Sequence, residues 1–296
     1  MMISVIIITY RRKEEILKCL ESIVSQDYNN YEIILIDNNK EEHFSEYILN
    51  HAKDVPRLKY IKNNFNSSVT GGRNLGVLHA SGDICVFIDD DAFFEKNNAL
   101  TLTSEKMNRE KDVGVLAYKI INYSSKNVER KEFPFKNKKI DKNTETEASY
   151  FLGGAHAIRR NVFGLVEGYP EDFIYGMEEL DISFRILDKG FKILYFPCVI
   201  AWHNPSISGR LEKKSYWKNI LENRLKVGIR NLPWRYFAIN FIIWSLKVLK
   251  ESKNIMVLIE TYSSLLRNRK EIQKGRKVIS NKTIKKLKLI DNRLYY

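Results

Sequence analysis

The chain has 296 residues, of which 44% are hydrophobic and 29% are charged, and its formal net charge is +13. This composition is typical of an ordered globular protein and excludes a disordered or fibrous one. The charge is unevenly distributed, because residues 206–296 contain 22 Lys and Arg but only 6 Asp and Glu. The last third should therefore be attracted to phosphate groups, whether of nucleic acid or of anionic lipid.

The cysteines and apolar segments indicate the compartment. Cys19, Cys85 and Cys198 are far apart and form no CxxC pair, which argues against a zinc ribbon or a disulfide framework and fits a reducing cytoplasm. The apolar run at residues 3–8 precedes the first basic residues, the reverse of a signal peptide. The longest apolar stretch, Tyr236 to Leu249, is shorter than the roughly 20 residues that a spanning helix needs. We therefore expect a cytoplasmic protein without a transmembrane helix.

The first part of the chain alternates between strand and helix patterns. Residues 4–9 (SVIIIT) and 31–37 (YEIILID) are continuous apolar runs, typical of strands that are covered on both faces. The elements expected here are strands at 4–9, 31–37, 60–62 and 84–88, with helices at about 13–25 and 72–80. This alternation predicts an α/β domain whose ligands bind at the carboxyl ends of the strands.

The pattern is looser after the fourth strand. Residues 124–147 are polar and rich in Lys and Asn, so we expect a surface excursion there. Regular structure resumes near Tyr150, and the later elements expected are a helix at about 177–189 and a strand at 191–196. From Ser206 onward the pattern is helical and basic, with no strand signal.

Three adjacent carboxylates, Asp89, Asp90 and Asp91, follow directly after the strand at 84–88. Such neighbours repel one another unless a cation or water shares the site. Mg²⁺ or Mn²⁺ would relieve the repulsion and also bind substrate phosphate. A solvated acidic loop is the alternative, and the position behind a buried strand favours the metal site.

Gly72 and Arg73 lie where the helix at 72–80 is expected to begin. Glycine allows the backbone to approach a ligand closely, a helix start offers free N–H groups to an anion, and Arg73 adds a charged fork. The same residues would also fit an ordinary turn before a helix. The anion-site interpretation therefore depends on the neighbouring aspartates.

Three further acids, Glu178, Glu179 and Asp181, crowd the start of the helix at about 177–189. A carboxylate next to a reactive centre can act as a general base. Negative charge in a first turn also complements the helix dipole, which would explain one or two of the three. His203 follows the last predicted strand, and a single histidine is more often structural than a ligand.

Together these motifs resemble those of glycosyltransferase family 2, which has a GT-A fold, and the resemblance covers roughly residues 3–203. The matching segments, in order, are SVIIITYRR at 4–12, IDNN at 36–39, GGRNLG at 71–76, IDDD at 88–91, GGAHAIRR at 153–160 and EELDISFRILDKG at 178–190. His203 falls where the rhamnosyl- and galactofuranosyl-transferase-like branch has a metal-binding His. Residues 222–224 resemble the RN segment of that branch.

The resemblance implies a GT-A domain over residues 1–205, Rossmann-like with a mostly parallel sheet and flanking helices. Residues 206–296 would then be a basic helical region for membrane association, acceptor binding or oligomerisation. The implied activity is inverting transfer of a sugar from a UDP- or dTDP-sugar to a hydroxyl of a glycan or lipid-linked acceptor in cell-surface polysaccharide synthesis. Mn²⁺ or Mg²⁺ is the implied cofactor.

The resemblance also assigns roles by position. The residues implied to bind the nucleotide sugar are Thr9, Tyr10, Arg11, Asp37, Asn39, Gly72, Arg73, Asp89 and Asp90. The implied metal ligands are Asp91, His203 and Asp89, and the implied acceptor-side residues are Gly153, Gly154, Glu178 and Asp181. Glu179 falls on the catalytic base, where the family usually has Asp, so its reach is longer by about one methylene.

Two other activities would account for single features of the sequence. A nucleic-acid-binding protein would explain the basic region, but that region lacks a zinc-finger, RNP or helix-turn-helix signature, so no nucleic-acid partner is expected. A nucleotidyltransferase would show a glycine-rich loop after the first strand, and TYRRKEE at 9–15 has no glycine.

The aromatic residues of the basic region suit a membrane interface. The expected apolar band consists of Phe237, Phe241, Ile242, Trp244, Ser245, Leu246, Val248 and Leu249, and the cations beside it are Arg230, Arg235, Lys247 and Lys250. This band predicts peripheral binding to the anionic inner face of the cell membrane. The alternative is that the band packs against the catalytic domain or forms a homodimer interface.

Overall fold

The structure, a computed structural model, describes residues 1–64, 68–137, 139–206, 211–291 and 293–295. Its centre is one mixed sheet with the strand order β3-β2-β1-β4-β8-β6-β9-β5, and β7 pairs with β9 beside this path. The strands are β1 (Ile3–Thr9), β2 (Tyr31–Asp37), β3 (Leu58–Lys62), β4 (Ile84–Ile88), β5 (Ala92–Phe94), β6 (Val113–Asn122), β7 (Thr146–Ala148), β8 (Ala155–Arg159) and β9 (Lys192–His203).

Strands β1 to β4 pair in parallel, as predicted. The second half of the sheet differs, because β8 runs antiparallel to both β4 and β6, while β6 and β9 are parallel. The predicted strand at 191–196 continues to His203, and the β6–β9 pairing shifts register next to Pro197. This irregularity accommodates a proline that cannot donate a ladder hydrogen bond.

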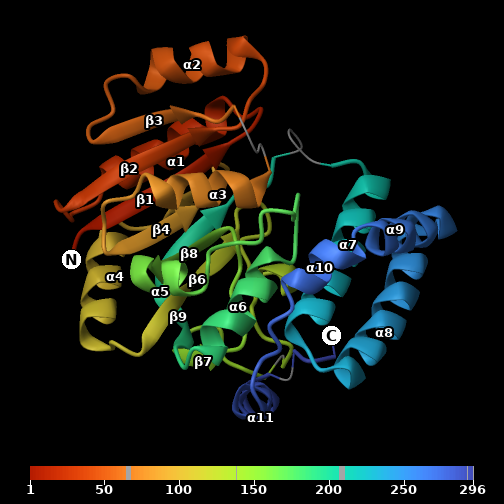
Figure 1. The fold of residues 1–296 in the computed structure, drawn as a ribbon. Coiled ribbons are helices and arrows are strands. Elements are labelled where there is room, and N and C mark those ends of the chain that lie inside the picture. The colour runs from red at the N-terminus through yellow and green to blue at the C-terminus, as the bar shows by residue number, and fades with distance from the viewer. Residues whose placement is uncertain (65–67, 138, 207–210, 292, 296) are drawn as a thin grey trace.

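Helices cover both faces of the sheet (Figure 1). They are α1 (Glu14–Val24), α2 (Glu42–Ala52), α3 (Val69–Leu78), α4 (Ala99–Arg109), the 3-10 turn η1 (Arg130–Glu132), α5 (Arg160–Leu165), α6 (Glu178–Asp188), α7 (Lys213–Asn231), α8 (Trp234–Ser252), α9 (Ile255–Arg267), α10 (Arg269–Lys274) and α11 (Asn281–Ile290). Alternate residues of the strands face opposite sides, so Ile33 and Leu35 pack with α1, α2 and α4, whereas Ile34 and Ile36 join the cluster that includes α5, α6 and α11.

The prediction of a surface excursion at 124–147 holds for most described residues of that segment, but residues 132–135 are buried. Phe133 and Phe135 are buried and lie edge-on to Tyr195 of β9. Strand β7 pairs with β9 at the end of the same segment. Two aromatic side chains among many polar ones are enough to anchor this segment to the core.

The C-terminal helices share the core of the α/β part. Val227, Leu232, Tyr236 and Leu287 belong to the same hydrophobic cluster as one face of the sheet. In Figure 1, α6 lies between the sheet and the blue C-terminal helices. The expected division at residues 205 and 206 therefore does not divide the core. None of the helices in the described ranges combines the length and the apolar character needed to cross a bilayer.

Candidate active site

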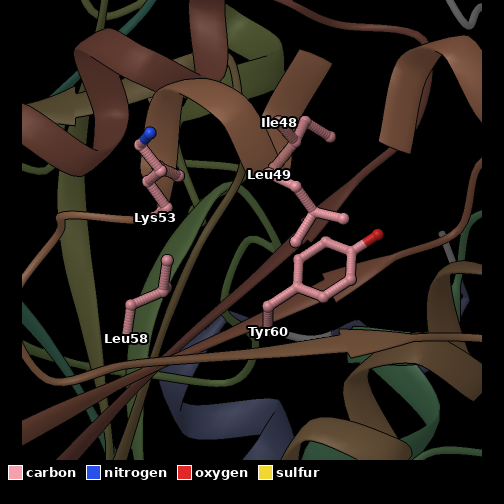
Figure 2. Close-up of a pocket in the computed structure, with 6 residues that line it drawn as sticks. Ile48, Leu49, Lys53, Leu58 and Tyr60 are labelled. Atoms are coloured by element: carbon pink, nitrogen blue, oxygen red, sulfur yellow. The ribbon is translucent and has the colours of Figure 1, made fainter. Parts of the chain in front are cut away.

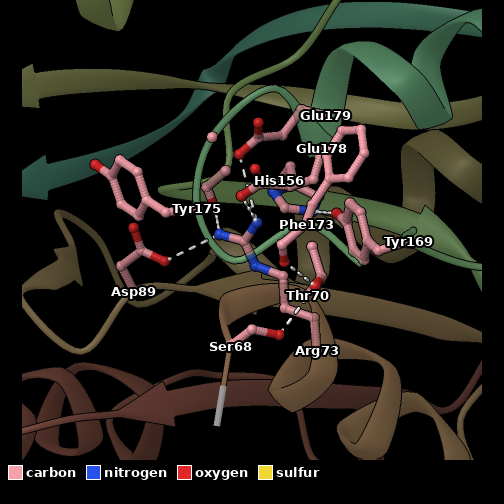
Figure 3. Close-up of polar contacts among 12 residues, drawn as sticks. Ser68, Thr70, Arg73, Asp89, His156, Tyr169, Phe173, Tyr175, Glu178 and Glu179 are labelled. Carbon is pink, nitrogen blue, oxygen red and sulfur yellow. Dashed lines mark hydrogen bonds and ion pairs between the residues drawn. The ribbon is translucent and has the colours of Figure 1, made fainter. Parts of the chain in front are cut away.

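Arg73 joins residues that are widely separated in the sequence (Figure 3). Its Nη1 lies 3.2 Å from Glu178 Oε1 and 3.4 Å from Glu179 Oε1. Its Nη2 lies 3.3 Å from Asp89 Oδ1 and donates to the carbonyl of Gly153 at 3.1 Å. We call these five residues the Arg73 cluster. The cluster brings together the motifs at the start of α3, the end of β4, the turn before β8 and the start of α6.

Local backbone structure explains how the cluster forms. Helix α3 begins at a Ser68 cap, whose side chain accepts from Gly71 N–H at 2.9 Å. A Cβ at Gly72 would lie 3.0 Å from Ile8 Cγ2, so glycine allows α3 to pack closely on β1. Gly176 and Met177 have φ of 82° and 71°, and this left-handed turn directs the first residues of α6 toward Arg73.

The two glutamates of the cluster have raised pKa values. Glu178 and Glu179 are 3% and 8% exposed. Burial raises the pKa of both, the neighbouring Glu178 raises that of Glu179 further, and Arg73 opposes the shift in each. A buried carboxylate with a raised pKa can accept a proton near neutral pH. Glu179 is the more exposed of the pair and is therefore better placed to meet a substrate.

Gly153 is the tightest point of the cluster. A Cβ there would lie 2.1 Å from Glu179 Oε1 and 2.6 Å from Arg73 Nη2. Next to it, the carbonyl of Gly154 accepts from Asp89 N–H at 3.0 Å and fixes the end of β4. The predicted acceptor-side glycines thus lie against the predicted base and the first aspartate.

Asp90 and Asp91 face Arg12, a residue that the sequence did not single out. Arg12 forms ion pairs with Asp90 and, at 3.0 Å, with Asp91. Burial raises the pKa of Asp90 to about 7 although Arg12 opposes the shift. Burial alone would also raise the pKa of Asp91, but His203 and Arg12 lower it, so Asp91 remains charged.

The predicted metal ligands Asp91 and His203 lie together. His203 Nε2 is 3.5 Å from Asp91 Oδ1, and His203 Nδ1 is 2.7 Å from Glu132 Oε1. If Nδ1–H donates to Glu132, the lone pair of Nε2 faces a carboxylate oxygen, and this conflict requires a proton or a cation. Burial would lower the pKa of His203, but these two carboxylates raise it to about 9.

Asp91 and His203 therefore fit a divalent cation, and Glu132 supports His203 as a carboxylate partner. Asp89, the third predicted ligand, is paired with Arg73 instead. Across the described ranges there is no group of three or more His, Cys, Asp or Glu side chains that could hold a metal. Two protein ligands are ordinary for Mg²⁺ at a phosphate site, where substrate oxygens and water complete the coordination.

The residues implied to hold the nucleobase lie at the ends of β1 and β2. Asp37 is fully buried and accepts from Asn39 N–H at 2.8 Å, Ser45 Oγ at 2.5 Å and Tyr60 OH at 2.5 Å. Burial alone would raise the pKa of Asp37, but these hydrogen bonds lower it. In this structure the Asp37 carboxylate is thus hydrogen-bonded to other residues of the protein.

The loop after β1 is held to the loop after β2. Arg11 N–H donates to Asn39 Oδ1 at 2.6 Å, and Tyr10 is 36% exposed. Thr9 Oγ1 is buried and has no hydrogen-bond partner within the described ranges. Arg73 lies in its own cluster with Glu178 and Glu179 rather than among these residues.

Asp181 does not join the Arg73 cluster. Its carboxylate pairs with Arg185 Nη2 at 2.5 Å and accepts from Asn231 Nδ2 of α7 at 2.7 Å. It therefore links α6 to α7, and the acceptor-side role implied by the resemblance has no support in these contacts.

A separate hollow lies between α2 and β3 (Figure 2) and is lined by Ile48, Leu49, Ala52, Lys53, Leu58 and Tyr60. None of the predicted site residues lines it. Its lining is mainly apolar, and its one link to the predicted site residues is Tyr60, whose OH donates to Asp37.

Comparison with known sequences identifies the family. The sequence profile of Glycosyl transferase family 2 matches residues 4–165, which is more than half of the chain. The chain belongs to glycosyltransferase family 2. A Bacillus subtilis relative, the uncharacterised glycosyltransferase YwdF, is 26% identical over 253 residues, which are 81% of this chain and 89% of YwdF.

A second relative has a stated activity. The GalNAc(5)-diNAcBac-PP-undecaprenol beta-1,3-glucosyltransferase of Campylobacter jejuni is 37% identical over 90 residues, which are 30% of this chain and only 29% of that protein. Among solved structures, the mannosyltransferase PcManGT from Pyrobaculum calidifontis, in complex with GDP-Man and Mn²⁺, aligns with a TM-score of 0.59. It is 16% identical, covering 90% of this chain and 74% of that one. This family 2 chain therefore has the GT-A fold, as predicted.

Proposed function

We propose that the protein is an inverting, metal-dependent glycosyltransferase that moves a sugar from a UDP- or dTDP-sugar to a hydroxyl of a glycan or lipid-linked acceptor in cell-surface polysaccharide synthesis. The Arg73 cluster supports this proposal best, because it joins a buried, proton-accepting glutamate to the first aspartate of the IDDD motif. The Campylobacter relative, whose name includes an undecaprenol-linked saccharide, supports the acceptor class. Membership of the rhamnosyl- and galactofuranosyl-transferase-like branch stays a prediction.

In this mechanism Glu179 accepts the proton of the acceptor hydroxyl, whose oxygen attacks the anomeric carbon from the face opposite the leaving nucleotide. Arg73 holds Glu179 in place, because Arg73 Nη1 donates to Glu179 Oε1. Asp91 and His203 would hold Mn²⁺ or Mg²⁺, which when bound stabilises charge on the departing diphosphate. Arg12 places a second positive charge beside Asp90 and Asp91.

A donor screen tests this function. Hydrolysis of UDP- and dTDP-sugars is measured with Mn²⁺ or Mg²⁺ and with EDTA, and the anomer released is identified by proton NMR. Glu179→Gln should reduce turnover about 10²- to 10⁴-fold, as expected for loss of a general base, with nucleotide affinity retained. Glu178→Gln is the matched variant, since it changes the other carboxylate on the same arginine. If only Glu178→Gln loses turnover, Glu178 is the base.

We also propose that the enzyme binds the anionic inner face of the membrane through α8 and α9. The structure corrects the predicted band, because Trp244 and Val248 pack in a cluster with α7 and α9. Ile242 and Leu246 of the predicted band are exposed. The other large apolar side chains that are exposed on these two helices are Trp234, Ile239, Ile255, Met256, Ile259 and Leu266. Residues 239, 242 and 246 are spaced by three or four and therefore share one face of α8.

Basic side chains flank this apolar face of α8. Arg235 lies at one end, Lys250 and Lys253 at the other, and all three are exposed. Apolar side chains beside cations suit an anionic lipid surface, where each cation contributes about 1 kcal/mol. The alternative is that the same face contacts a second copy of this chain in a homodimer.

Sedimentation with vesicles distinguishes membrane binding from homodimer formation. The double variant Ile242→Glu, Leu246→Glu should lose binding to anionic vesicles, whereas Leu289→Glu, at a residue 87% exposed on α11, should retain it. Wild-type binding should rise with anionic lipid content and fall with salt. Absence of binding at low salt, together with a dimer in light scattering that the double variant abolishes, would favour the homodimer.

A further inference from the structure

The loop that precedes α6 is held from two sides. On the α3 side, Thr70 Oγ1 donates to the carbonyl of Phe173 at 2.6 Å. On the α7 side, Asn223 Nδ2 donates to the carbonyls of Tyr175 and Gly176 at 3.0 and 2.9 Å. Asn223 is 2% exposed, so water competes little for these hydrogen bonds. The loop between α3 and α7 is therefore fixed at three carbonyls within residues 173–176.

Packing restricts the same loop further. Gly176 has φ of 82°, and a Cβ there would lie 2.5 Å from Ile220 Cδ1 of α7. Any residue other than glycine would have both backbone strain and a clash at this position. The backbone of the residue before it, Tyr175, is thus fixed four positions ahead of the predicted base.

Tyr175 is exposed although its backbone is fixed. The residue is 41% exposed, and its ring centroid lies 5.8 Å from that of Tyr216 on α7. Tyr216 in turn packs edge-on against Trp217 at 5.1 Å. Figure 3 shows Tyr175 on the same side of the Arg73 guanidinium as Asp89. Burial and Tyr216 raise the pKa of Tyr175, and Glu178 and Asp89 add to the shift, so the ring lies within the field of the catalytic carboxylates.

We propose that Tyr175, supported by Tyr216 and Trp217, is the surface on which a pyranose ring of the acceptor stacks. This inference rests on the proposed glycosyltransferase function and names part of its acceptor site. The apolar C–H face of a pyranose fits an aromatic ring, while its hydroxyls remain free for polar partners. A ring on Tyr175 would bring a hydroxyl toward Glu179. Acceptor recognition is then shared between the loop before α6 and the start of α7.

Saturation-transfer NMR tests this site with a panel of methyl pyranosides of glucose, galactose, rhamnose, N-acetylglucosamine and N-acetylgalactosamine. With wild type, at least one glycoside should show transfer to its ring C–H protons, and titration gives its Kd. Tyr175→Ala should weaken this binding about 2- to 12-fold, the range for loss of one aromatic contact, and Tyr175→Phe should restore it. Ile174→Ala is the matched control, because Ile174 is a 59% exposed neighbour without a ring.

Two results overturn the proposal: no transfer to any glycoside with wild type, or the same Kd in wild type and Tyr175→Ala. The normal binding expected of Tyr175→Phe shows that a loss in Tyr175→Ala does not come from misfolding. Donor hydrolysis is measured on the wild type in the same experiment. Hydrolysis without any effect of Tyr175→Ala refutes the stacking surface alone, whereas no hydrolysis of any donor refutes the proposed function.

Discussion

Gly153→Ala should separate catalysis from folding. The added Cβ would lie 2.1 Å from Glu179 Oε1, and ordinary contacts begin near 3.4 Å, so the carboxylate has to move by roughly 1.3 Å. The nearest atoms are the ends of the flexible side chains of Glu179 and Arg73 rather than backbone, so they can move while the fold persists. A misplacement of about 1 Å at a reacting group costs about 10²-fold in rate. We expect a loss of that size with nearly unchanged stability.

The assay compares donor turnover and thermal unfolding of Gly153→Ala with those of Gly164→Ala. Gly164 is the matched control, because a Cβ there would meet no atom within 4 Å. Normal turnover of Gly153→Ala with an unchanged Tm would refute the position assigned to Glu179. A large drop in Tm would show instead that the cluster supports the fold as much as the reaction.

Three other predictions concern the metal, the base and α7. Asp91→Asn should abolish the Mn²⁺-dependent part of nucleotide binding and His203→Ala should weaken it; calorimetry with and without Mn²⁺ decides, and unchanged affinity in Asp91→Asn refutes the assignment. Burial raises the pKa of Glu179, so its base form is lost as pH falls through that raised pKa. The acidic limb of the pH profile of kcat should therefore lie well above about pH 4.3, the ordinary pKa of a glutamate. The profile of Glu179→Gln should lack this limb. Asn223→Ala should lower kcat about 10-fold with little change in donor KM, and a comparable rise in KM would argue against a positioning role.

The first half of the fold was predictable because β1, β2 and β4 are nearly continuous apolar runs. Strands β6 and β8 were not predicted. Gly114 and Lys119 interrupt the apolar pattern of β6, and β8 begins with small or polar residues at 155–157. The long β9 was predicted only in part because Pro197 resembles a strand end. Local sequence does not show that a register shift will absorb a proline, which depends on the neighbouring strand.

The site was predictable as a set of motifs, but its pairings were not. Asp91 and His203 were expected to act together, and they do lie together. Arg12 was missed although it lies in the TYRR segment, because nothing local shows that its side chain faces Asp90 and Asp91. Glu132 was missed because it lies in a polar segment whose only signal of burial is the pair of phenylalanines that follows it.

The contacts of α7 decide how the basic region can be studied. The change of charge at residue 206 suggested a separate unit. Net charge, however, reflects the exposed residues of a segment and does not indicate which of its residues pack against the rest of the protein. Asn223 holds the loop before α6, and Asn231 donates to Asp181 within α6. Removing α7 would leave the carboxylate of Asp181 without one of its partners and would expose apolar core, each a recognised cause of severe destabilisation. A truncation near Ser206 would therefore abolish turnover and membrane binding together. Only point substitutions on the exposed face of α8 can separate the two.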